Sequence, residues 1–115
     1  HHPKEILATL SAARGIQDAR KGRVIAVLQP HRFTRVRDLF DDFAKSMKDA
    51  DEIVLADIYT AGEAPIDGVT QATLSKRITE LGGKKVSTFK EKEELAPLIQ
   101  KIAKPGDMVV CMGAG

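Results

Sequence analysis

The sequence predicts an α/β fold with a doubly wound, mostly parallel sheet. Short apolar runs rich in β-branched residues alternate with longer segments in which apolar residues recur every three or four positions. The connections between these segments are short, as in folds that bury a parallel sheet between helices. At 115 residues, the chain fits a single domain with a core of ordinary size.

The first predicted helix begins at Pro3, since proline suits the first turn of a helix. Its buried stripe is expected to consist of Ile6, Leu7, Leu10 and Ala13. Gly15 is expected to end this helix, and residues 16–22 to form a polar surface loop. Residues 23–28 are almost entirely apolar and predict a buried parallel strand.

The same alternation continues through the middle of the chain. A second helix is predicted over residues 34–48, with Thr34 as its N-cap. Its apolar face consists of Leu39, Phe40, Phe43 and Met47. Residues 53–56 predict a second buried strand, with Ile58 just beyond it. Residues 59–68 contain two glycines and a proline and predict a loop.

The last part of the chain predicts two more helices and two more strands. Thr70 is expected to cap a helix that ends at Gly82-Gly83. Residues 85–89 predict a short strand, and residues 91–103 a helix. The first of these helices has apolar residues at helical spacing, Leu74, Ile78 and Leu81. In the second, the apolar side chains expected to face inward are Leu95, Leu98, Ile99 and Ile102. Pro105-Gly106 predicts a turn before the last strand, residues 108–112.

Both ends of this pattern look incomplete. The first predicted helix has no strand before it, and the glycine-rich turn at residues 113–115 has no helix after it. We therefore expect a fold that is truncated at both ends and belongs to a larger protein.

Composition argues against several classes of protein. The net charge of +2 comes from 18 basic and 16 acidic residues, a balance too even for a nucleic-acid or membrane surface. The sequence contains no apolar run of membrane-spanning length and no recognisable signal peptide. We expect a cytoplasmic protein that binds neither nucleic acid nor membrane. Cys111, the single cysteine, lies in the last predicted strand and is expected to be buried and inert.

Three arginines lie between the first strand and the second helix, at a helix start where acidic residues are usually favoured. The stretch reads Gln29-Pro30-His31-Arg32-Phe33-Thr34-Arg35-Val36-Arg37. A helix N-terminus carries partial positive charge and favours acidic residues, yet Arg32, Arg35 and Arg37 come first here. A bound anion would account for this arrangement. The alternative is that the arginines are solvated or pair with the acids Asp38, Asp41 and Asp42.

The loop after the second strand is expected to reach the same edge of the sheet, because neighbouring parallel strands end side by side. This places Tyr59 and Glu63 opposite His31, Arg32 and Arg35. Glu63 would orient the arginines, receive an ammonium group, or be a solvated loop acid. The Tyr59 ring would either support the site or simply pack at the end of the strand.

Other chemistries find little support in the sequence. Gly82-Gly83-Lys84-Lys85 lacks the spacing of a phosphate-binding Walker loop, and residues 113–115 are only a fragment of a dinucleotide fingerprint. The histidines, His1, His2 and His31, have no cysteine or paired carboxylates near them. We therefore expect no metal site and assign no catalytic residue within this chain.

Four motifs, in order, resemble the C-terminal domain of the Mur ligases. They are His-His-Pro-x-Glu at the start, Gln-Pro-His-Arg-Phe-Thr-Arg-x-Arg-Asp-Leu-Phe-Asp-Asp-Phe, Ala-Gly-Glu-Ala-Pro-Ile, and Gly-Ala-Gly at the end. The second motif is the most specific. Within the family, the resemblance is strongest to the members that add L-alanine. It also identifies His1 and His2 as native residues rather than the remnant of a tag.

The resemblance implies a Rossmann-like fold, present as the amino-acid-binding domain of a three-domain ligase of peptidoglycan biosynthesis. Such a ligase uses ATP and Mg²⁺ to phosphorylate the carboxylate of UDP-N-acetylmuramate, and the amine of L-alanine then attacks the acyl phosphate. ATP, Mg²⁺ and UDP-N-acetylmuramate would be bound mainly by the other domains, so this chain alone should be inactive. By resemblance, His31, Arg32 and Arg35 would hold the carboxylate of L-alanine, with His1 beside them.

Two other functions stay open at the level of sequence. A non-enzymatic α/β module would bind a phosphate or carboxylate ligand through the same arginines. A protein-interaction domain would use the loop at residues 59–68. The sequence also does not separate alanine from serine or glycine as the amino acid.

Overall fold

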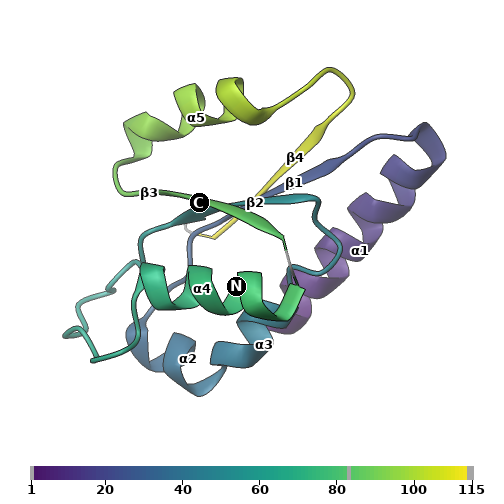
Figure 1. The fold of residues 1–115 in the computed structure, drawn as a ribbon. Coiled ribbons are helices and arrows are strands. Elements are labelled where there is room, and N and C mark those ends of the chain that lie inside the picture. Colours follow the sequence, from purple (N-terminus) through teal and green to yellow (C-terminus); the bar gives the residue numbers. More distant parts are fainter. Residues whose placement is uncertain (1, 83, 114–115) are drawn as a thin grey trace.

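The computed structural model describes residues 2–82 and 84–113, and these residues form a parallel sheet of four strands. The strands are β1 (Val24–Leu28), β2 (Glu52–Ala56), β3 (Lys85–Phe89) and β4 (Met108–Met112). Their order in the sheet is β3-β2-β1-β4, so the chain enters at the centre, moves to one edge and returns to the other (Figure 1). The predicted parallel, doubly wound sheet is confirmed.

Helices cover both faces of the sheet. The helical segments are α1 (Pro3–Arg20), α2 (Phe33–Asp38), α3 (Phe40–Lys45), α4 (Gln71–Gly82), the 3₁₀ turn η1 (Lys92–Glu94) and α5 (Leu95–Ile102). The first four helices lie on one face, and α5 lies on the other (Figure 1). Among the described residues, no helix combines the length and the apolarity needed to cross a membrane.

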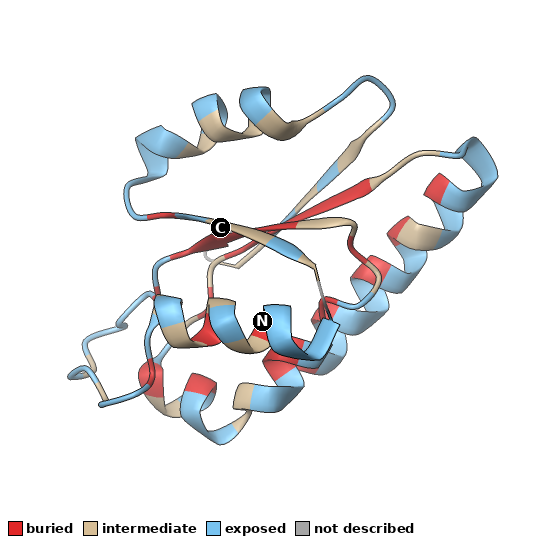
Figure 2. Cartoon of the chain, viewed as in Figure 1, coloured by how far each residue is buried: buried red, intermediate tan, exposed pale blue. Residues whose placement is uncertain are grey.

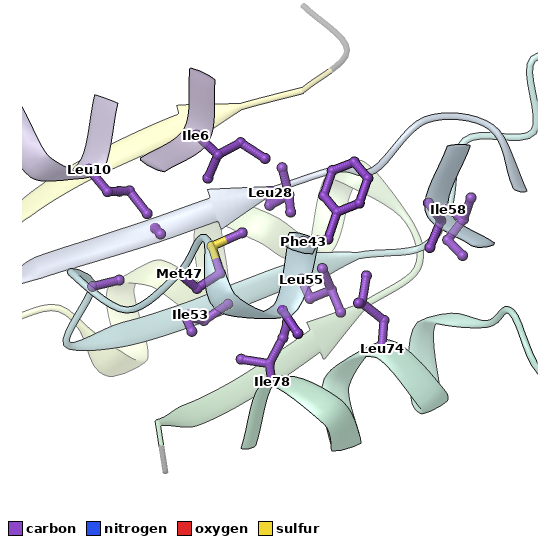
Figure 3. Close-up of a cluster of buried hydrophobic side chains, with 14 of the residues drawn as sticks. Ile6, Leu10, Leu28, Phe43, Met47, Ile53, Leu55, Ile58, Leu74 and Ile78 are labelled. Carbon is purple, nitrogen blue, oxygen red and sulfur yellow. The ribbon is translucent and has the colours of Figure 1, made fainter. Parts of the chain in front are cut away.

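The core has two parts, one on each face of the sheet. Every residue of β1 is buried (Figure 2). Its alternate residues belong to the clusters on opposite faces of the sheet. Leu28 packs into the larger cluster with side chains from α1, α3 and α4, such as Leu10, Phe43 and Ile78 (Figure 3). Ile25 and Val27 pack against the apolar side of α5. Full burial of such side chains stabilises the fold by about 1.5–3 kcal/mol each.

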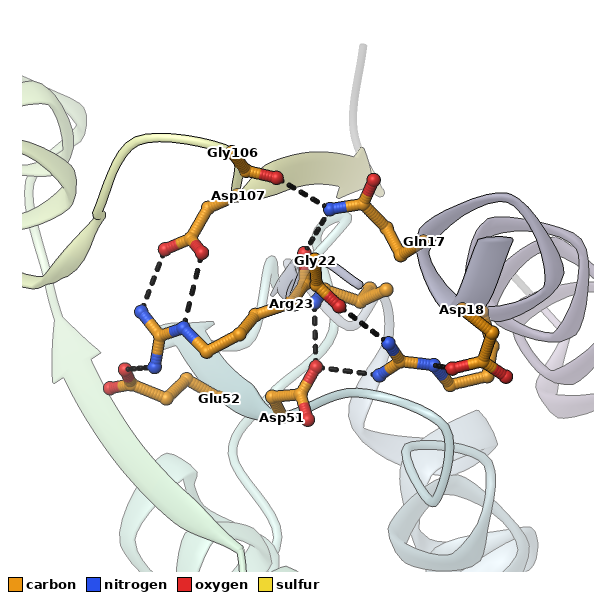
Figure 4. A network of polar contacts seen from close by, with 10 residues as sticks. Gln17, Asp18, Gly22, Arg23, Asp51, Glu52, Gly106 and Asp107 are labelled. Carbon is orange, nitrogen blue, oxygen red and sulfur yellow. Dashed lines mark hydrogen bonds and ion pairs between the residues drawn. The ribbon is translucent and has the colours of Figure 1, made fainter. Parts of the chain in front are cut away.

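Gly15 does not end the first helix, and the prediction of a loop over residues 16–22 is wrong. α1 continues to Arg20 and ends at Lys21, which has a left-handed φ of 56°. Gln17 explains the extension. Its side chain is fully buried, and Nε2 donates hydrogen bonds to the carbonyls of Arg23 (2.6 Å) and Gly106 (2.8 Å) (Figure 4). These long-range contacts outweigh the cost of a glycine inside a helix, about 0.5–1 kcal/mol.

Ion pairs tie together the edge of the sheet at which the strands begin (Figure 4). Arg23 bonds to Glu52 at 2.7 Å and to Asp107 at 2.7 Å, linking the starts of three strands. Arg14 of α1 bonds to Asp51 at 2.6 Å. These ion pairs hold together the edge at which the strands begin. The arginine-rich stretch lies at the opposite edge, where the strands end.

The predicted helix over residues 34–48 is two short helices, α2 and α3, which meet at Leu39. Leu39 leaves the helical conformation, with φ −120° and ψ 28°. The bend allows Phe33 and Val36 of α2, and Phe43 of α3, all to be buried in the same cluster. Neither glycine nor proline occurs at this bend, so the local sequence carries no signal for it.

The other predicted helices are confirmed with small changes. Thr70 caps α4, since its Oγ1 accepts a hydrogen bond from the Thr73 amide at 3.1 Å. The first turn of the predicted helix at 91–103 is the 3₁₀ turn η1, closed by a capping box between Glu91 and Glu94. Gly83, half of the predicted stop of α4, lies outside the described residues.

Cys111 is exposed, and the prediction of a buried thiol is wrong. It lies on β4, an edge strand, opposite Val27 of β1. Its side of the sheet is the one that α5 covers, but α5 packs over Ile25, Val27 and their neighbours in β2 and β3. Because the helix does not extend over β4, Cys111 and Val109 are left exposed.

Candidate functional site

The two loops that the sequence placed together do meet. We call residues 29–37 the arginine loop and residues 59–68 the Tyr59 loop. The amide of Arg32 donates to the carbonyl of Tyr59 at 2.8 Å, and the amide of Tyr59 donates to the carbonyl of Pro30 at 2.9 Å. These bonds form a parallel bridge between His31 and Tyr59 beyond the ends of β1 and β2. The backbone thus fixes one loop against the other.

The end of β4, at Met112 and Gly113, also contacts the arginine loop. The amide of Gln29 donates to the carbonyl of Met112 at 3.0 Å. Gly113 has φ 132°, and a Cβ there would lie 2.7 Å from the Gln29 carbonyl oxygen. Only glycine fits this close approach. Gly113 is the one described residue of the Gly-Ala-Gly motif, because residues 114 and 115 lie outside the described range.

The sequence suggested Thr34 as the N-cap of the second helix, and this prediction is wrong. α2 begins at Phe33, and its N-cap is Arg32, whose side chain makes no capping hydrogen bond. Arg32 has φ 66°, a conformation that costs a residue other than glycine about 1–3 kcal/mol. The hydrogen bond from its amide to Tyr59 holds it there. Strain of this kind is concentrated at functional sites.

Glu63 supplies the acid that the start of α2 lacks. Its Oε1 accepts from the Thr34 amide at 3.0 Å, and its Oε2 accepts from the Thr34 hydroxyl at 2.7 Å. These bonds, with the nearby Arg32, lower the pKa of Glu63 below its usual value. A turn carries the chain to Glu63 through Ala61 and Gly62, which both have positive φ. Glu63 is therefore not a solvated loop acid.

This contact changes the predicted anion site. The Thr34 amide at the helix start is already bonded to a carboxylate of the chain. An external anion would therefore be held by the arginine side chains rather than by the end of α2.

Arg32 and Arg35 are exposed, and within residues 2–82 and 84–113 neither forms an ion pair. The alternative, pairing along the helix, holds only for Arg37, which bonds to Asp38 at 2.9 Å. Asp41 instead pairs with Arg77 of α4 at 2.9 Å. Two guanidinium groups three residues apart thus remain for a ligand.

His31 lies half-buried beside the arginines. Its ring centroid is 5.1 Å from that of Tyr59, which is itself half exposed. Burial lowers the pKa of His31 below its usual 6.5, and the positive charges of Arg35 and Arg32 lower it further. At neutral pH the imidazole is therefore uncharged. His1, the remaining predicted site residue, lies outside the described residues.

The arrangement suits a carboxylate or phosphate. Arginine binds both groups bidentately, and a neutral imidazole adds one hydrogen bond. Among the residues described, no group of three or more His, Cys, Asp or Glu side chains could hold a metal ion. Of these features, the sequence missed the Thr34–Glu63 contact and the strain at Arg32, because both depend on the second loop.

Comparisons with known proteins found a matching family, related sequences and related structures. The family described as Mur ligase, glutamate ligase domain, matches residues 1–115. The UDP-N-acetylmuramate–L-alanine ligase of Brucella anthropi is 51% identical over 115 residues, and that of Brucella ovis is 50% identical. These matches cover all of the chain and 24% of each relative, so the chain spans about a quarter of their length.

Two solved structures share the fold. The UDP-N-acetylmuramate–alanine ligase of Thermotoga maritima matches with a TM-score of 0.66 and 23% identity, over 100% of this chain and 22% of that one. A domain assigned to a UDP-N-acetylmuramate:L-alanyl-γ-D-glutamyl-diaminopimelate ligase of Haemophilus ducreyi matches with a TM-score of 0.66 and 25% identity, over 100% and 74%.

Proposed function

The chain belongs to the Mur ligase family, and from this premise we propose that it is the amino-acid-binding domain of an ATP-dependent ligase that joins L-alanine to UDP-N-acetylmuramate. Relatives that carry this name are 50–51% identical over the whole chain. The same relatives favour a ligase over a non-enzymatic module that binds a phosphate or carboxylate.

The observation that carries the proposal is the pair Arg32 and Arg35, which form no ion pair in the described part of the chain and lie beside His31, whose pKa is lowered. The two guanidinium groups would bind the carboxylate of L-alanine. This would leave the amine directed away from the arginines. Orientation of this kind lowers the entropic cost of the reaction.

The amine would then attack the acyl phosphate of UDP-N-acetylmuramate, which the other parts of the ligase would present. A C–N bond forms at the acyl carbon, the bond from that carbon to the phosphate oxygen breaks, and the amine loses a proton. The products are the amide, inorganic phosphate and, from the preceding phosphorylation, ADP. The role of this chain is to hold and orient the nucleophile.

Glu63 would serve as a positioning residue. Both of its carboxylate oxygens are bonded to Thr34, which favours this role over that of a receptor for the ammonium group. By holding the first turn of α2, it fixes the backbone from which Arg32 and Arg35 project. The Tyr59 ring would limit the space beside His31.

ATP and Mg²⁺ would be bound mainly by the rest of the ligase, because the chain has no Walker loop. The family resemblance assigns UDP-N-acetylmuramate to the rest of the ligase as well. The described residues likewise offer no cluster of carboxylates for Mg²⁺. We place the ligase in the cytoplasm and in peptidoglycan synthesis, and therefore in cell wall formation, cell shape and division.

A titration of this chain with L-alanine, followed by amide NMR, tests the proposal. We expect shifts confined to the arginine loop and the Tyr59 loop. L-Alaninamide, which has the amine but no carboxylate, should cause none of them. Equal shifts with both compounds, or shifts elsewhere only, would contradict the proposal. Glycine and L-serine in the same titration would show how strongly the site selects for the methyl group.

A further inference from the structure

A hollow lies on the face of the sheet that α1, α3 and α4 cover, away from the arginine loop. We call it the lysine groove. It has a volume of about 560 Å³ and lies between the first turns of α1, the end of α3 with the turn that follows, and the end of α4. Of the described residues that line it, none belongs to the arginine loop or the Tyr59 loop. Sites for small molecules typically measure roughly 300–1,000 Å³.

The floor of the lysine groove is apolar. Ala44, Met47 and Ile78 lie at its base and are at most 4% exposed. Leu7 and Leu81 line the groove and are 37% and 38% exposed, so the prediction that Leu7 is buried is wrong. Together with the buried floor, these two leucines give the groove an apolar lining that an aliphatic group could contact.

The rim of the lysine groove is cationic. The lysines that line it are Lys4, Lys45, Lys48 and Lys84, and Asp42 is the single acid among the described lining residues. Within the described ranges, none of the four lysines forms an ion pair. Lys4 also lies in the first turn of α1, where the helix dipole disfavours a cation. Positive charge thus collects around an apolar hollow, where a low dielectric strengthens its field.

We propose that the lysine groove is a binding site for a small soluble amphiphile with an aliphatic body and one anionic group. The body would cover Leu7 and Leu81, and the carboxylate, phosphate or sulfonate would lie among the lysines. The charge of the rim is complementary to an anion, and the volume lies within the range of small-molecule sites. This site is separate from the one proposed for the amino acid, and its test does not depend on that proposal.

Amide NMR of the chain with decanoate, kept below its micelle concentration, tests the groove. We expect shifts at Leu7, Met47, Ile78 and Leu81, and none at Arg32 or Arg35. Decyltrimethylammonium has an aliphatic chain of the same length with the opposite charge and should bind more weakly, by roughly fivefold or more if several lysines contribute. Equal binding of the two probes, or decanoate shifts centred on the arginine loop or on α5, would overturn the proposal.

Charge variants locate the anion. The double variant Lys45→Glu/Lys48→Glu should weaken decanoate binding by about tenfold. The matched control, Lys92→Glu/Lys101→Glu, makes the same change of charge on the other face of the sheet and should leave the affinity unchanged. An equal loss in both variants would show an effect of net charge alone and overturn the proposal.

Two further measurements keep the test decisive. Lys45→Gln/Lys48→Gln removes the charges without introducing acids, and it should also weaken decanoate binding. It replaces the first variant if that one fails to fold. Sedimentation with anionic vesicles checks for a membrane ligand. Binding to vesicles without any decanoate shift would contradict a soluble ligand, as would dimerisation of the chain through this groove.

Discussion

The carboxylate of Glu63 holds Thr34 by two hydrogen bonds, one to its amide at 3.0 Å and one to its hydroxyl at 2.7 Å. The two residues are 29 positions apart, and the contact joins the Tyr59 loop to the first turn of α2. It satisfies the helix start with an acid of the chain itself. Arg32 and Arg35 flank this contact and form no ion pair in the described part of the chain.

We predict that Glu63→Gln weakens binding of L-alanine by less than loss of either arginine does, because the glutamine side chain would keep one accepting oxygen but not the charge. The Thr34 amide should lose protection from hydrogen exchange in the variant. Thr34→Val, which removes only the hydroxyl bond, is the milder companion change. Unchanged exchange at Thr34 in Glu63→Gln would show that the contact does not hold the loop.

The lowered pKa of His31 predicts the pH dependence of the site. In the free chain, an NMR titration of the His31 ring should give a midpoint below 6.5. Bound L-alanine should raise that midpoint, since its carboxylate favours the charged imidazole, and binding should tighten as the pH falls through this range. A midpoint at or above 6.5, or one that L-alanine leaves unchanged, would contradict the arrangement.

The lowered pKa of His31 also affects stability. The unfolded chain binds the His31 proton more tightly than the folded chain does. The contribution of the neutral imidazole is therefore fully present above pH 6.5 and decreases as the pH falls below it. Chemical unfolding between about pH 5 and pH 8 should show this slope in the natural chain, and His31→Gln should reduce it.

A pair of glycine variants tests the length of α1. Gly15 lies inside the helix, and nothing lies within 4 Å of the position that an alanine methyl group would take there, so Gly15→Ala should stabilise the fold by about 0.5–1 kcal/mol. At Gly22, a Cβ would lie 2.8 Å from the Gly106 carbonyl oxygen and 2.4 Å from Gln17 Nε2, so Gly22→Ala should destabilise by about 1–3 kcal/mol. Urea unfolding measures both. Destabilisation by Gly15→Ala would indicate that the helix ends there.

The chain alone should neither hydrolyse ATP nor form an amide, since it lacks a Walker loop. A phosphate-release assay with ATP, L-alanine and UDP-N-acetylmuramate should give the rate of a blank without protein. Release above the blank that disappears in Arg32→Ala would contradict this.

Local patterns in the sequence predicted the strands closely. β3 and β4 have the predicted bounds, and β1 and β2 differ from them by one residue. Alternation of strands and helices also predicted that His31 and Tyr59 would meet, because parallel neighbours end at one edge.

Long-range contacts explain what the sequence did not predict. Gly15 looked like a helix stop, but Gln17 bonds to Gly106, 89 residues away. Cys111 looked buried, but its exposure depends on how far α5 extends over the sheet. The Thr34–Glu63 contact likewise joins two separate loops. Such contacts have no periodic pattern in the sequence.

The central claim is that Arg32 and Arg35 bind the carboxylate of L-alanine, and steady-state kinetics of the full-length ligase test it most directly. Loss of one charge-assisted hydrogen bond costs about 1.5–3 kcal/mol, or roughly 10- to 150-fold in affinity. Arg32→Ala and Arg35→Ala should therefore raise the KM for L-alanine by about that factor, with little change in the KM for ATP. Arg32→Lys should also be damaging, since lysine does not bind bidentately.

Arg37→Ala is the matched control, because Arg37 pairs with Asp38 and its loss should leave both KM values near those of the natural enzyme. An unchanged KM for L-alanine in Arg32→Ala and Arg35→Ala, with a raised KM for ATP, would assign the arginine loop to the nucleotide and contradict the account.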